Sequence, residues 1–255
     1  MPSTRYKFII IIAILVIVFW GYNQTSRFKD IKKIQEIIST ANVDFYLDDR
    51  IWFQEVRAEL KDNAVILKGN AFFERPILGI EKKLRKAGYE YEVIDSLNYL
   101  PEPFADGLAY GVITEPYIMG RYQAVSHKQE GTEMLYGEPV RLIREADPFI
   151  QVQSATGYLG YIPKAALRTV GLAEWNRYQG GRHAVFTSNE TLKNGLEILM
   201  GTRLPLLGEN RILLANGNEL NCASDKFQVA DPGSNPLRSA IVASAKQYLD
   251  LPYVW

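Results

Sequence analysis

The sequence predicts a mixed α+β and β fold made of an N-terminal membrane helix, a small ββαβ domain, two small β-barrels and the start of another α+β domain. Three observations support this prediction. Residues 8–20 form an unbroken apolar run. Residues 124–168 contain short alternating apolar segments separated by turn residues, a pattern typical of a small barrel. A turn sequence from that stretch returns near residue 200, which indicates a duplicated domain.

Length and composition limit the possible functions. The chain has 255 residues, enough for two or three domains. Its 29 Lys and Arg residues balance 29 Asp and Glu residues, so we expect no nucleic-acid partner. Cys222 is the single cysteine, which excludes a disulfide within the chain, and no base lies beside it in the sequence. We interpret it as a core cysteine. The sequence predicts no cofactor and no metal site.

The amino terminus carries a targeting signal. Thirteen apolar residues, Phe8 to Trp20, follow Arg5 and Lys7, which is the pattern of a signal sequence. Residues 1–27 are therefore either an uncleaved signal anchor or a signal peptide that is removed. As an anchor, residues 8–22 would contact the membrane. In both cases we expect the bulk of the chain to be exported and extracytoplasmic.

Residues 28–100 predict an amphipathic helix followed by a small ββαβ domain. Two alternating strands flank the turn Lys61-Asp62-Asn63, a helix begins at Pro76 and ends at Gly88, and a third strand follows. In its order of elements this region resembles the BON-like domains. The sequence Leu100-Pro101-Glu102-Pro103 then predicts a linker.

Two barrels follow, predicted at 108–170 and 182–231, with a helical connector at 171–181. The stretch 135–143 (LYGEPVRLI) is echoed by 199–207 (LMGTRLPLL), with a turn glycine at the same place. In the second copy, Asn216-Gly217 is a strong hairpin signal.

Two motifs resemble a known family. Leu135-Tyr-Gly-Glu-Pro-Val-Arg-Leu, followed by Gly157-Tyr-Leu-Gly-Tyr-Ile-Pro, resembles the bacterial SH3-like domains that precede NlpC-type cell-wall peptidases. Ala245-Lys-Gln-Tyr-Leu-Asp-Leu-Pro-Tyr-Val-Trp resembles the opening of the papain-like catalytic domain of that family. The resemblance implies two SH3-like β-barrels and the first helix of a papain-like α+β domain at 235–255. In the family, the nucleophilic cysteine and its histidines come after the Pro-Tyr-x-Trp motif, so the sequence up to Trp255 is expected to be inactive.

The resemblance also implies site residues. Tyr253 matches the tyrosine that lines the active site and donates to the oxyanion, although a packed aromatic side chain is the alternative. An acidic residue and a tyrosine of the first barrel recognise the free amine of the stem peptide in related enzymes. The nearest matches are Glu130 and Tyr158, with Gln129 or Glu133 as alternatives to Glu130.

These observations lead to two hypotheses. In the first, the chain is the non-catalytic part of a membrane-associated cysteine peptidase of the γ-D-glutamyl-diamino acid endopeptidase type. Its SH3-like barrels then bind and restrict peptidoglycan stem peptides. In the second, the chain is an anchored, non-enzymatic SH3-like module that binds cell-wall peptides or a partner protein. Whether the protein is an enzyme is left open by the sequence.

Overall fold

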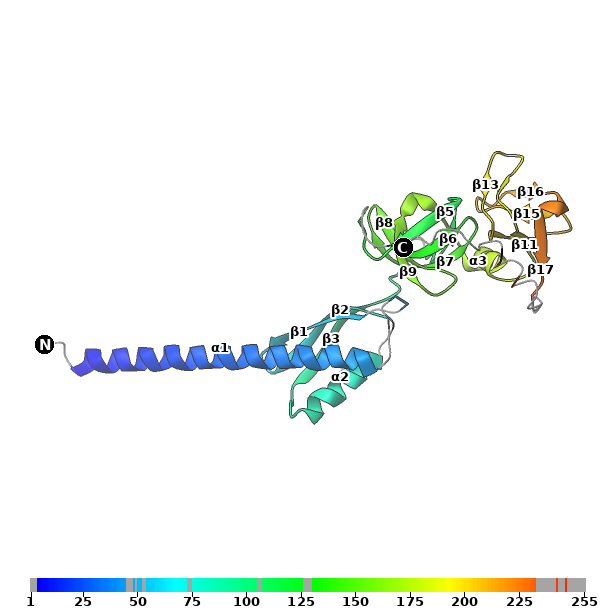
Figure 1. Cartoon of the computed structure of the whole chain (residues 1–255). Helices are drawn as coiled ribbons and strands as arrows, with labels where there is room; N and C mark the ends of the chain where they lie inside the picture. Colours follow the sequence, from blue (N-terminus) through cyan, green and yellow to red (C-terminus); the bar gives the residue numbers. More distant parts are fainter. Residues whose placement is uncertain are drawn as a thin grey trace. The chain divides into compact units, whose positions relative to one another are not determined.

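The structure, a computed structural model of the chain, forms two compact units (Figure 1). It describes residues 4–44, 48, 50–51, 54–72, 75–104, 107–125, 130–232, 242 and 246. The first unit comprises Met1–Phe104, Ile143–Glu145 and Gly157–Leu159. The second comprises Ala105–Leu142, Ala146–Thr156 and Gly160–Trp255. The predicted papain-like helix at 235–255 lies almost entirely outside the described residues.

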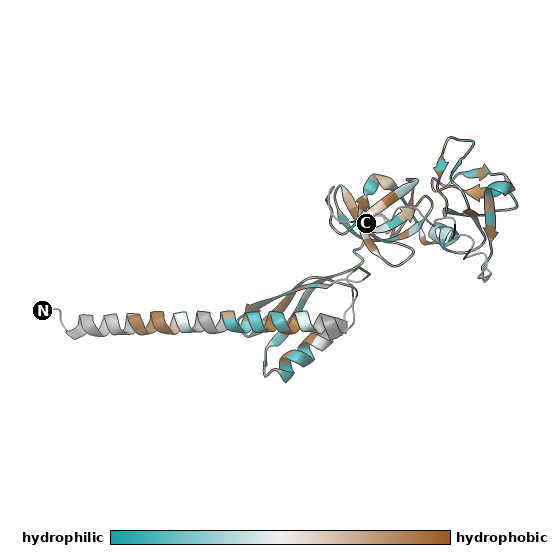
Figure 2. Ribbon diagram, in the orientation of Figure 1, coloured by the Kyte–Doolittle hydropathy of each residue, from teal (hydrophilic) through white to brown (hydrophobic). Residues whose placement is uncertain are grey.

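The amino-terminal helix differs from the prediction. α1 (Thr4–Asp44) is one continuous helix of 41 residues that contains the apolar run Phe8–Trp20, and Figure 2 shows a hydrophobic section, in brown, along this helix. None of the helices that the structure describes is long and apolar enough to cross a membrane. The predicted N-terminal membrane helix, with its membrane contact through residues 8–22, is therefore wrong. The 13 apolar residues from Phe8 to Trp20 fall short of the roughly 20 that a bilayer requires, and polar residues follow from Asn23.

The first unit contains a three-stranded sheet in the order β1-β2-β3. Its elements are β1 (Gln54–Lys61), β2 (Ala64–Ala71), α2 (Arg75–Lys86) and β3 (Glu92–Tyr99). β1 and β2 form an antiparallel hairpin whose turn residue Asp62 has a φ of 52°. β3 pairs parallel to β2, so α2 is the crossover between them.

The end of α2 is specified locally. Gly88 has a φ of 83°, and its N–H donates to the carbonyl of Arg85 at 3.0 Å. The N–H of Tyr89 donates to the carbonyl of Leu84, also at 3.0 Å. These two bonds form a Schellman motif, which glycine favours because it adopts a positive φ without strain. Ala87 is exposed, because the helix ends at Lys86.

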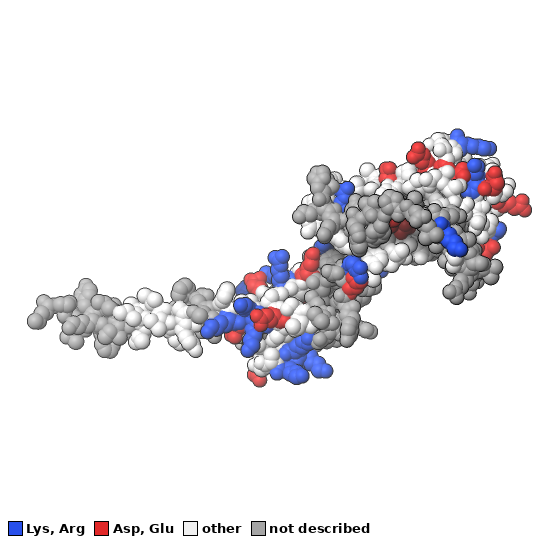
Figure 3. Space-filling view, viewed as in Figure 1, with Lys and Arg blue, Asp and Glu red and all other residues white. Residues whose placement is uncertain are grey.

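Both helices bury their apolar side chains against this sheet. The core combines residues of α1, α2 and the strands: Ile34, Ile38, Val56, Val65, Leu67, Ile80 and Leu84. Gln35 of α1 also bonds the β1 backbone, because its amide donates to the carbonyl of Val56 at 3.1 Å and accepts from the N–H of Ala58 at 3.0 Å. It thereby satisfies two groups of an edge strand. Figure 3 shows charged side chains of both signs interspersed over this unit.

The first barrel belongs to a seven-stranded sheet in the order β10-β4-β7-β8-β9-β5-β6. The elements are β4 (Tyr110–Ile113), β5 (Tyr117–Arg121), β6 (Glu130–Leu135), β7 (Pro139–Ala146), β8 (Phe149–Gln153), β9 (Leu159–Pro163), the 3₁₀ turn η1 (Lys164–Ala166) and β10 (Leu167–Val170). β10 pairs antiparallel with β4 and so joins the last strand of the barrel to the first.

The second barrel follows the helix α3 (Leu172–Gln179). Its elements are β11 (His183–Phe186), β12 (Glu190–Thr191), β13 (Glu197–Ile198), β14 (Arg203–Pro205), β15 (Arg211–Leu213), β16 (Glu219–Asn221), η2 (Ser224–Lys226) and β17 (Phe227–Ala230). They form the sheet β14-β11-β17 and the two hairpins β12-β13 and β15-β16. As in the first barrel, the last strand pairs with the first.

The repeated turn sequences adopt the same backbone arrangement. The N–H of Gly137 donates to the carbonyl of Ile113 at 2.9 Å, and the N–H of Gly201 donates to that of Phe186 at 2.8 Å. In return, the N–H of Ile113 donates to the carbonyl of Glu138 at 3.0 Å. In the second barrel, the N–H of Phe186 likewise donates to the carbonyl of Thr202 at 3.0 Å. Each turn thus joins the first strand of its barrel to the strand after the glycine.

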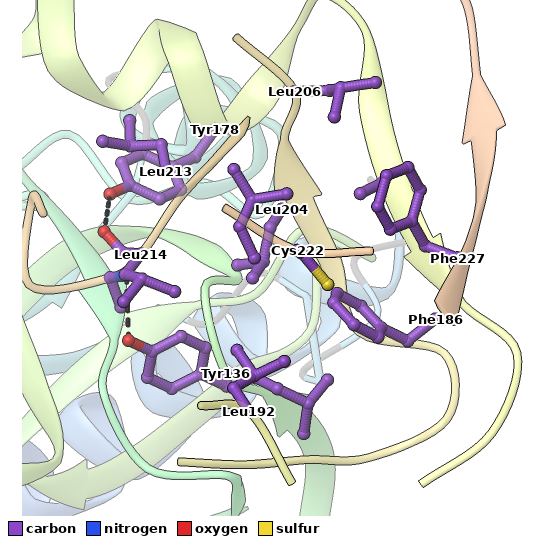
Figure 4. Packing of buried hydrophobic residues seen from close by; sticks show 14 of the residues in the cluster. Tyr136, Tyr178, Phe186, Leu192, Leu204, Leu206, Leu213, Leu214, Cys222 and Phe227 are labelled. Atoms are coloured by element: carbon purple, nitrogen blue, oxygen red, sulfur yellow. Dashed lines mark hydrogen bonds between the residues drawn. The ribbon is translucent and has the colours of Figure 1, made fainter. Parts of the chain in front are cut away.

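The two barrels share one hydrophobic core. Side chains of the first barrel and α3, including Val112, Tyr136, Val170 and Tyr178, are buried in the same cluster as the core of the second barrel. Figure 4 shows Tyr136 and Tyr178 reaching the chain around Leu214 from opposite sides. The residues of this cluster therefore pack the two barrels together within the second unit.

Candidate functional site

The three predicted site residues have different outcomes. Tyr253 lies outside the described residues, so its role stays a prediction. Glu130 opens β6, where its backbone is in register with Arg121 of β5, but its side chain is also outside what the structure describes. Tyr158 is described and half-buried, directly before β9. The structure therefore tests the surroundings of Tyr158 and leaves its pairing with Glu130 a prediction.

A cation lies over the ring of Tyr158. Within the first unit, the guanidinium carbon of Arg50 is 5.4 Å from the ring centroid. Asp48 holds this guanidinium by accepting from Nε at 2.9 Å and from Nη2 at 2.7 Å. These hydrogen bonds lower the pKa of the Asp48 carboxyl. The N–H of Leu159 also donates to the carbonyl of Arg50 at 2.7 Å. One face of the phenol ring is thus suited to a positive group.

The cysteine and the described histidine do not form a catalytic pair. Cys222 is buried, and burial raises the pKa of its thiol, which disfavours the nucleophilic thiolate. The ring of His183 is buried, with Nδ1 2.9 Å from the carbonyl oxygen of Gly181 and Nε2 3.0 Å from that of Tyr178. Both ring nitrogens are therefore occupied by backbone. His127 lies outside the described residues, and the described ones contain no group of His, Cys, Asp and Glu suited to a metal ion.

A cavity of about 170 Å³ lies between the two barrels and the end of α3. We call it the inter-barrel cavity. Its walls come from the turn between β6 and β7, the turn between β8 and β9, the end of α3 and the turn before β14. The lining residues are Leu135, Tyr136, Glu138, Pro139, Ala155, Thr156, Tyr178, Gln179, Gly201 and Arg203.

Glu138 and Arg203 are the charged residues of this lining. The carboxylate of Glu138 accepts hydrogen bonds from the N–H of Leu135 at 3.3 Å and from the N–H of Ala155 at 3.1 Å. Burial raises the pKa of this carboxyl. Arg203 is exposed at the start of β14, and its guanidinium has no hydrogen bond or ion pair with another described residue. The cavity therefore carries two opposite charges, each without a charged protein partner in the described chain.

The aromatic walls of the cavity are fixed by hydrogen bonds. The hydroxyl of Tyr178 donates to the carbonyl of Leu214 at 2.6 Å, and that of Tyr136 accepts from the N–H of Ala215 at 3.1 Å (Figure 4). Burial raises the pKa of Tyr178 to about 12 and also raises that of Tyr136. Both phenols are therefore neutral at physiological pH and act as rigid walls.

An ion pair fastens the same region. Nε of Arg168 donates to the carbonyl of Ala215 at 2.7 Å. The two terminal nitrogens of Arg168 bond the carboxylate of Glu174 on α3, at 2.5 and 3.2 Å. The hydrogen bond from Arg168 lowers the pKa of Glu174. One guanidinium thus connects the first barrel, α3 and the second barrel.

Sequence reasoning did not single out Glu138 or Arg203 as site residues. A signal was present, since both follow a repeated turn glycine: Gly137-Glu138-Pro139 in one copy and Gly201-Thr202-Arg203 in the other. What the repeat could not indicate is that the two turns lie against one cavity.

Comparison with known proteins relates one of these barrels to a family. No curated protein matches the sequence. The crystal structure of a NlpC/P60 family protein from Bacillus cereus ATCC 10987 is similar, with a TM-score of 0.49 and 17% sequence identity over 57% of this chain. The similarity covers 65% of that protein's chain, so this chain spans less than two thirds of its length. Residues 122–167 match the model of the bacterial dipeptidyl-peptidase SH3 domain. Residues 122–167 of the first barrel are thus similar to the SH3 domain described for bacterial dipeptidyl-peptidases.

Proposed function

We propose that the barrels are the non-catalytic, peptide-binding part of a cell-wall cysteine peptidase that acts on peptidoglycan stem peptides. The observation that carries this proposal is the match of residues 122–167 to the dipeptidyl-peptidase SH3 domain. The substrate class we propose is the stem peptide with a free amino terminus and a γ-D-glutamyl bond to a diamino acid. Because peptidoglycan lies outside the cytoplasm, the proposal includes export of the barrels.

In this proposal, Tyr158 binds the amino terminus of the stem peptide. Its ring already carries a cation on one face, the guanidinium of Arg50. A peptide ammonium would compete for the same face, where a cation–π contact contributes roughly 0.5–2 kcal/mol. Glu130 would supply the carboxylate that pairs with this ammonium. Arg50 then acts as a competitor that a peptide displaces.

Binding rather than hydrolysis is the activity we propose for the described residues. The thiol of Cys222 is buried and protonated, and the ring nitrogens of His183 both face carbonyl oxygens. Activation of a thiol needs a base within hydrogen-bond reach. Hydrolysis of stem peptides by the 255-residue protein that is abolished by Cys222→Ala would contradict this assignment.

The binding proposal can be tested by calorimetric titration of the chain with the tripeptide L-alanyl-γ-D-glutamyl-diaminopimelate and with its N-acetylated form. We expect the free peptide to bind at least tenfold more tightly, since an ammonium–carboxylate hydrogen bond contributes about 1.5–3 kcal/mol. Tyr158→Leu should remove this preference, and Arg50→Gln should strengthen binding of the free peptide.

Two further variants sharpen the assignment of the carboxylate. Glu130→Gln should remove the preference for the free amine, whereas the same loss in Glu133→Gln would move the role to the exposed neighbour in β6. Glu209→Gln, an exposed residue of the second barrel, is the matched control. Equal affinity of the unaltered protein for free and acetylated peptide would reject the proposal.

A further inference from the structure

The inter-barrel cavity presents opposite charges on an otherwise largely apolar lining. Leu135, Pro139 and the rings of Tyr136 and Tyr178 form apolar walls. Glu138 belongs to the first barrel and Arg203 to the second, and both residues line this cavity. We propose that this cavity binds one free aliphatic α-amino acid as a zwitterion, with its ammonium at Glu138 and its carboxylate at Arg203.

The size of the cavity fits one amino acid. A cavity of about 150 Å³ accommodates a benzene molecule, and the volume here is about 170 Å³. This is enough for an α-amino acid with a branched aliphatic side chain, whereas a folded peptide would not fit. The apolar walls suit such a side chain because they provide dispersion contacts and remove apolar surface from water.

Glu138 supplies the recognition of the ammonium. Its two carboxylate oxygens each accept one backbone N–H, from Leu135 and Ala155, which fixes the carboxylate at the cavity wall. No described cation forms an ion pair with it. A partly buried carboxyl without a counter-charge is costly in its ionised form, and burial raises the pKa of Glu138 accordingly. An ammonium in the cavity would provide the missing positive charge and up to three hydrogen-bond donors.

Arg203 supplies the recognition of the carboxylate. Arg203 is a lining residue of the cavity, and its guanidinium has no hydrogen bond or ion pair with another described residue. Guanidinium groups bind carboxylates through two parallel hydrogen bonds. A zwitterionic ligand would therefore use both of its charged ends, and an analogue that lacks either end would leave one protein charge uncompensated. The inference does not depend on the wall-peptide function, because Tyr158 and Glu130 are not part of this lining.

The test is a calorimetric titration of the whole chain with L-valine, 3-methylbutanoate and 2-methylpropan-1-amine. The second compound lacks the amine of valine and the third lacks its carboxylate. We expect saturable binding of one L-valine, and binding of each analogue weaker by roughly tenfold or more, the loss of one charge-assisted hydrogen bond. Absence of saturable binding up to about 10 mM, or equal binding of valine and either analogue, would overturn the proposal.

Variants locate the binding within the structure. Arg203→Gln should weaken valine binding by roughly tenfold without disturbing the hydrogen bonds of Glu138. Ala155→Leu keeps the backbone N–H that donates a hydrogen bond to Glu138, and its larger side chain fills part of the cavity. It should therefore abolish valine binding. Arg211→Gln, an exposed arginine of the same barrel that pairs with Glu219 outside the cavity, is the matched control. Unchanged valine binding in both Arg203→Gln and Ala155→Leu would place the site elsewhere and refute the inference.

Discussion

The two barrels have the same turn geometry but different side chains at the equivalent positions. Gly137 and Gly201 both have a positive φ, of 77° and 92°, and make the same backbone hydrogen bonds. The residue before the glycine is Tyr136 in the first barrel and Met200 in the second. Tyr136 is buried and its hydroxyl accepts a hydrogen bond from the second barrel, whereas Met200 is half-exposed.

The residue after the glycine differs as well. Glu138 directs its carboxylate to two backbone N–H groups beside the inter-barrel cavity. Its counterpart Thr202 is fully buried, and its hydroxyl has no hydrogen-bond partner among the described residues. The comparison shows that the glycine and the strand register maintain the barrel, while the adjacent residues determine what each copy contributes to the interface.

The largest effect is expected when the turn glycine itself is changed. The Cβ of an alanine at position 137 would collide with a methyl group of Leu204 across the interface. The alanine would also have to adopt the positive φ of this turn. Gly137→Ala should therefore reduce the free energy of unfolding by about 2–5 kcal/mol, combining left-handed strain with overpacking. Gly195→Ala is the control, since Gly195 has a φ of 82° but nothing within 4 Å of an added Cβ. It should cost about 1–2 kcal/mol. If Gly137→Ala and Gly195→Ala lose the same free energy of unfolding, measured by urea denaturation, then Leu204 does not constrain the turn.

Exchanging the residues before the two glycines should have unequal effects. Tyr136→Met removes the acceptor for the buried N–H of Ala215 and should cost about 1–3 kcal/mol. The reverse exchange, Met200→Tyr, affects a half-exposed position and should change stability by less than about 0.5 kcal/mol. Similar losses for both exchanges would contradict the assigned role of Tyr136 in joining the barrels.

The two glutamates of the interface region should respond to pH in opposite directions. The folded-state pKa of Glu174 lies below its ordinary value of 4.5, so its contribution is present above pH 4.5 and is lost as the pH falls through the folded value. The folded-state pKa of Glu138 lies above 4.5, so its contribution is present below pH 4.5 and is lost as the pH rises through the folded value.

Glutamine variants separate these two contributions. Glu174→Gln should lower the free energy of unfolding near neutral pH by about 0.5–1 kcal/mol, as expected for a partly exposed ion pair. The variant should also no longer lose this contribution as the pH falls below 4.5. Glu138→Gln should reduce the decrease in the free energy of unfolding that Glu138 causes as the pH rises above 4.5. The measurement is the free energy of unfolding between about pH 3 and pH 7. The same change of slope in both variants would be inconsistent with opposite pKa shifts.

The smallest effect is expected at Thr202. Replacing it with the isosteric valine removes a buried hydroxyl that has no hydrogen-bond partner in the described structure. Thr202→Val should therefore be neutral or should stabilise the protein by up to about 1 kcal/mol. A loss of more than 1 kcal/mol by the same measure would indicate that the hydroxyl contributes a contact.

Local features were predictable because they depend on neighbouring residues. The turn around Asp62 and the hairpin at Asn216-Gly217 lie where the sequence indicates, since a positive φ selects these residue types. The alternation of Val56, Ala58 and Leu60 matches the face of β1 that joins the core. The error at the amino terminus also came from a local pattern. The apolar run Phe8–Trp20 indicated a membrane helix, whereas it is one section of a 41-residue helix that is not apolar over the length a bilayer requires.

The site depends on contacts that no local pattern contains. Tyr136 meets Ala215 across 79 positions in the sequence, and Arg168 meets the same residue across 47. The sequence by itself determined the turns, the strand faces, the repeated glycine and the match to a bacterial SH3 domain. The tertiary structure alone decided that the two barrels share a core and that Glu138 and Arg203 line one cavity. The physical reason is that turn and strand preferences act over a few residues, whereas packing joins surfaces whose residues are far apart in the chain.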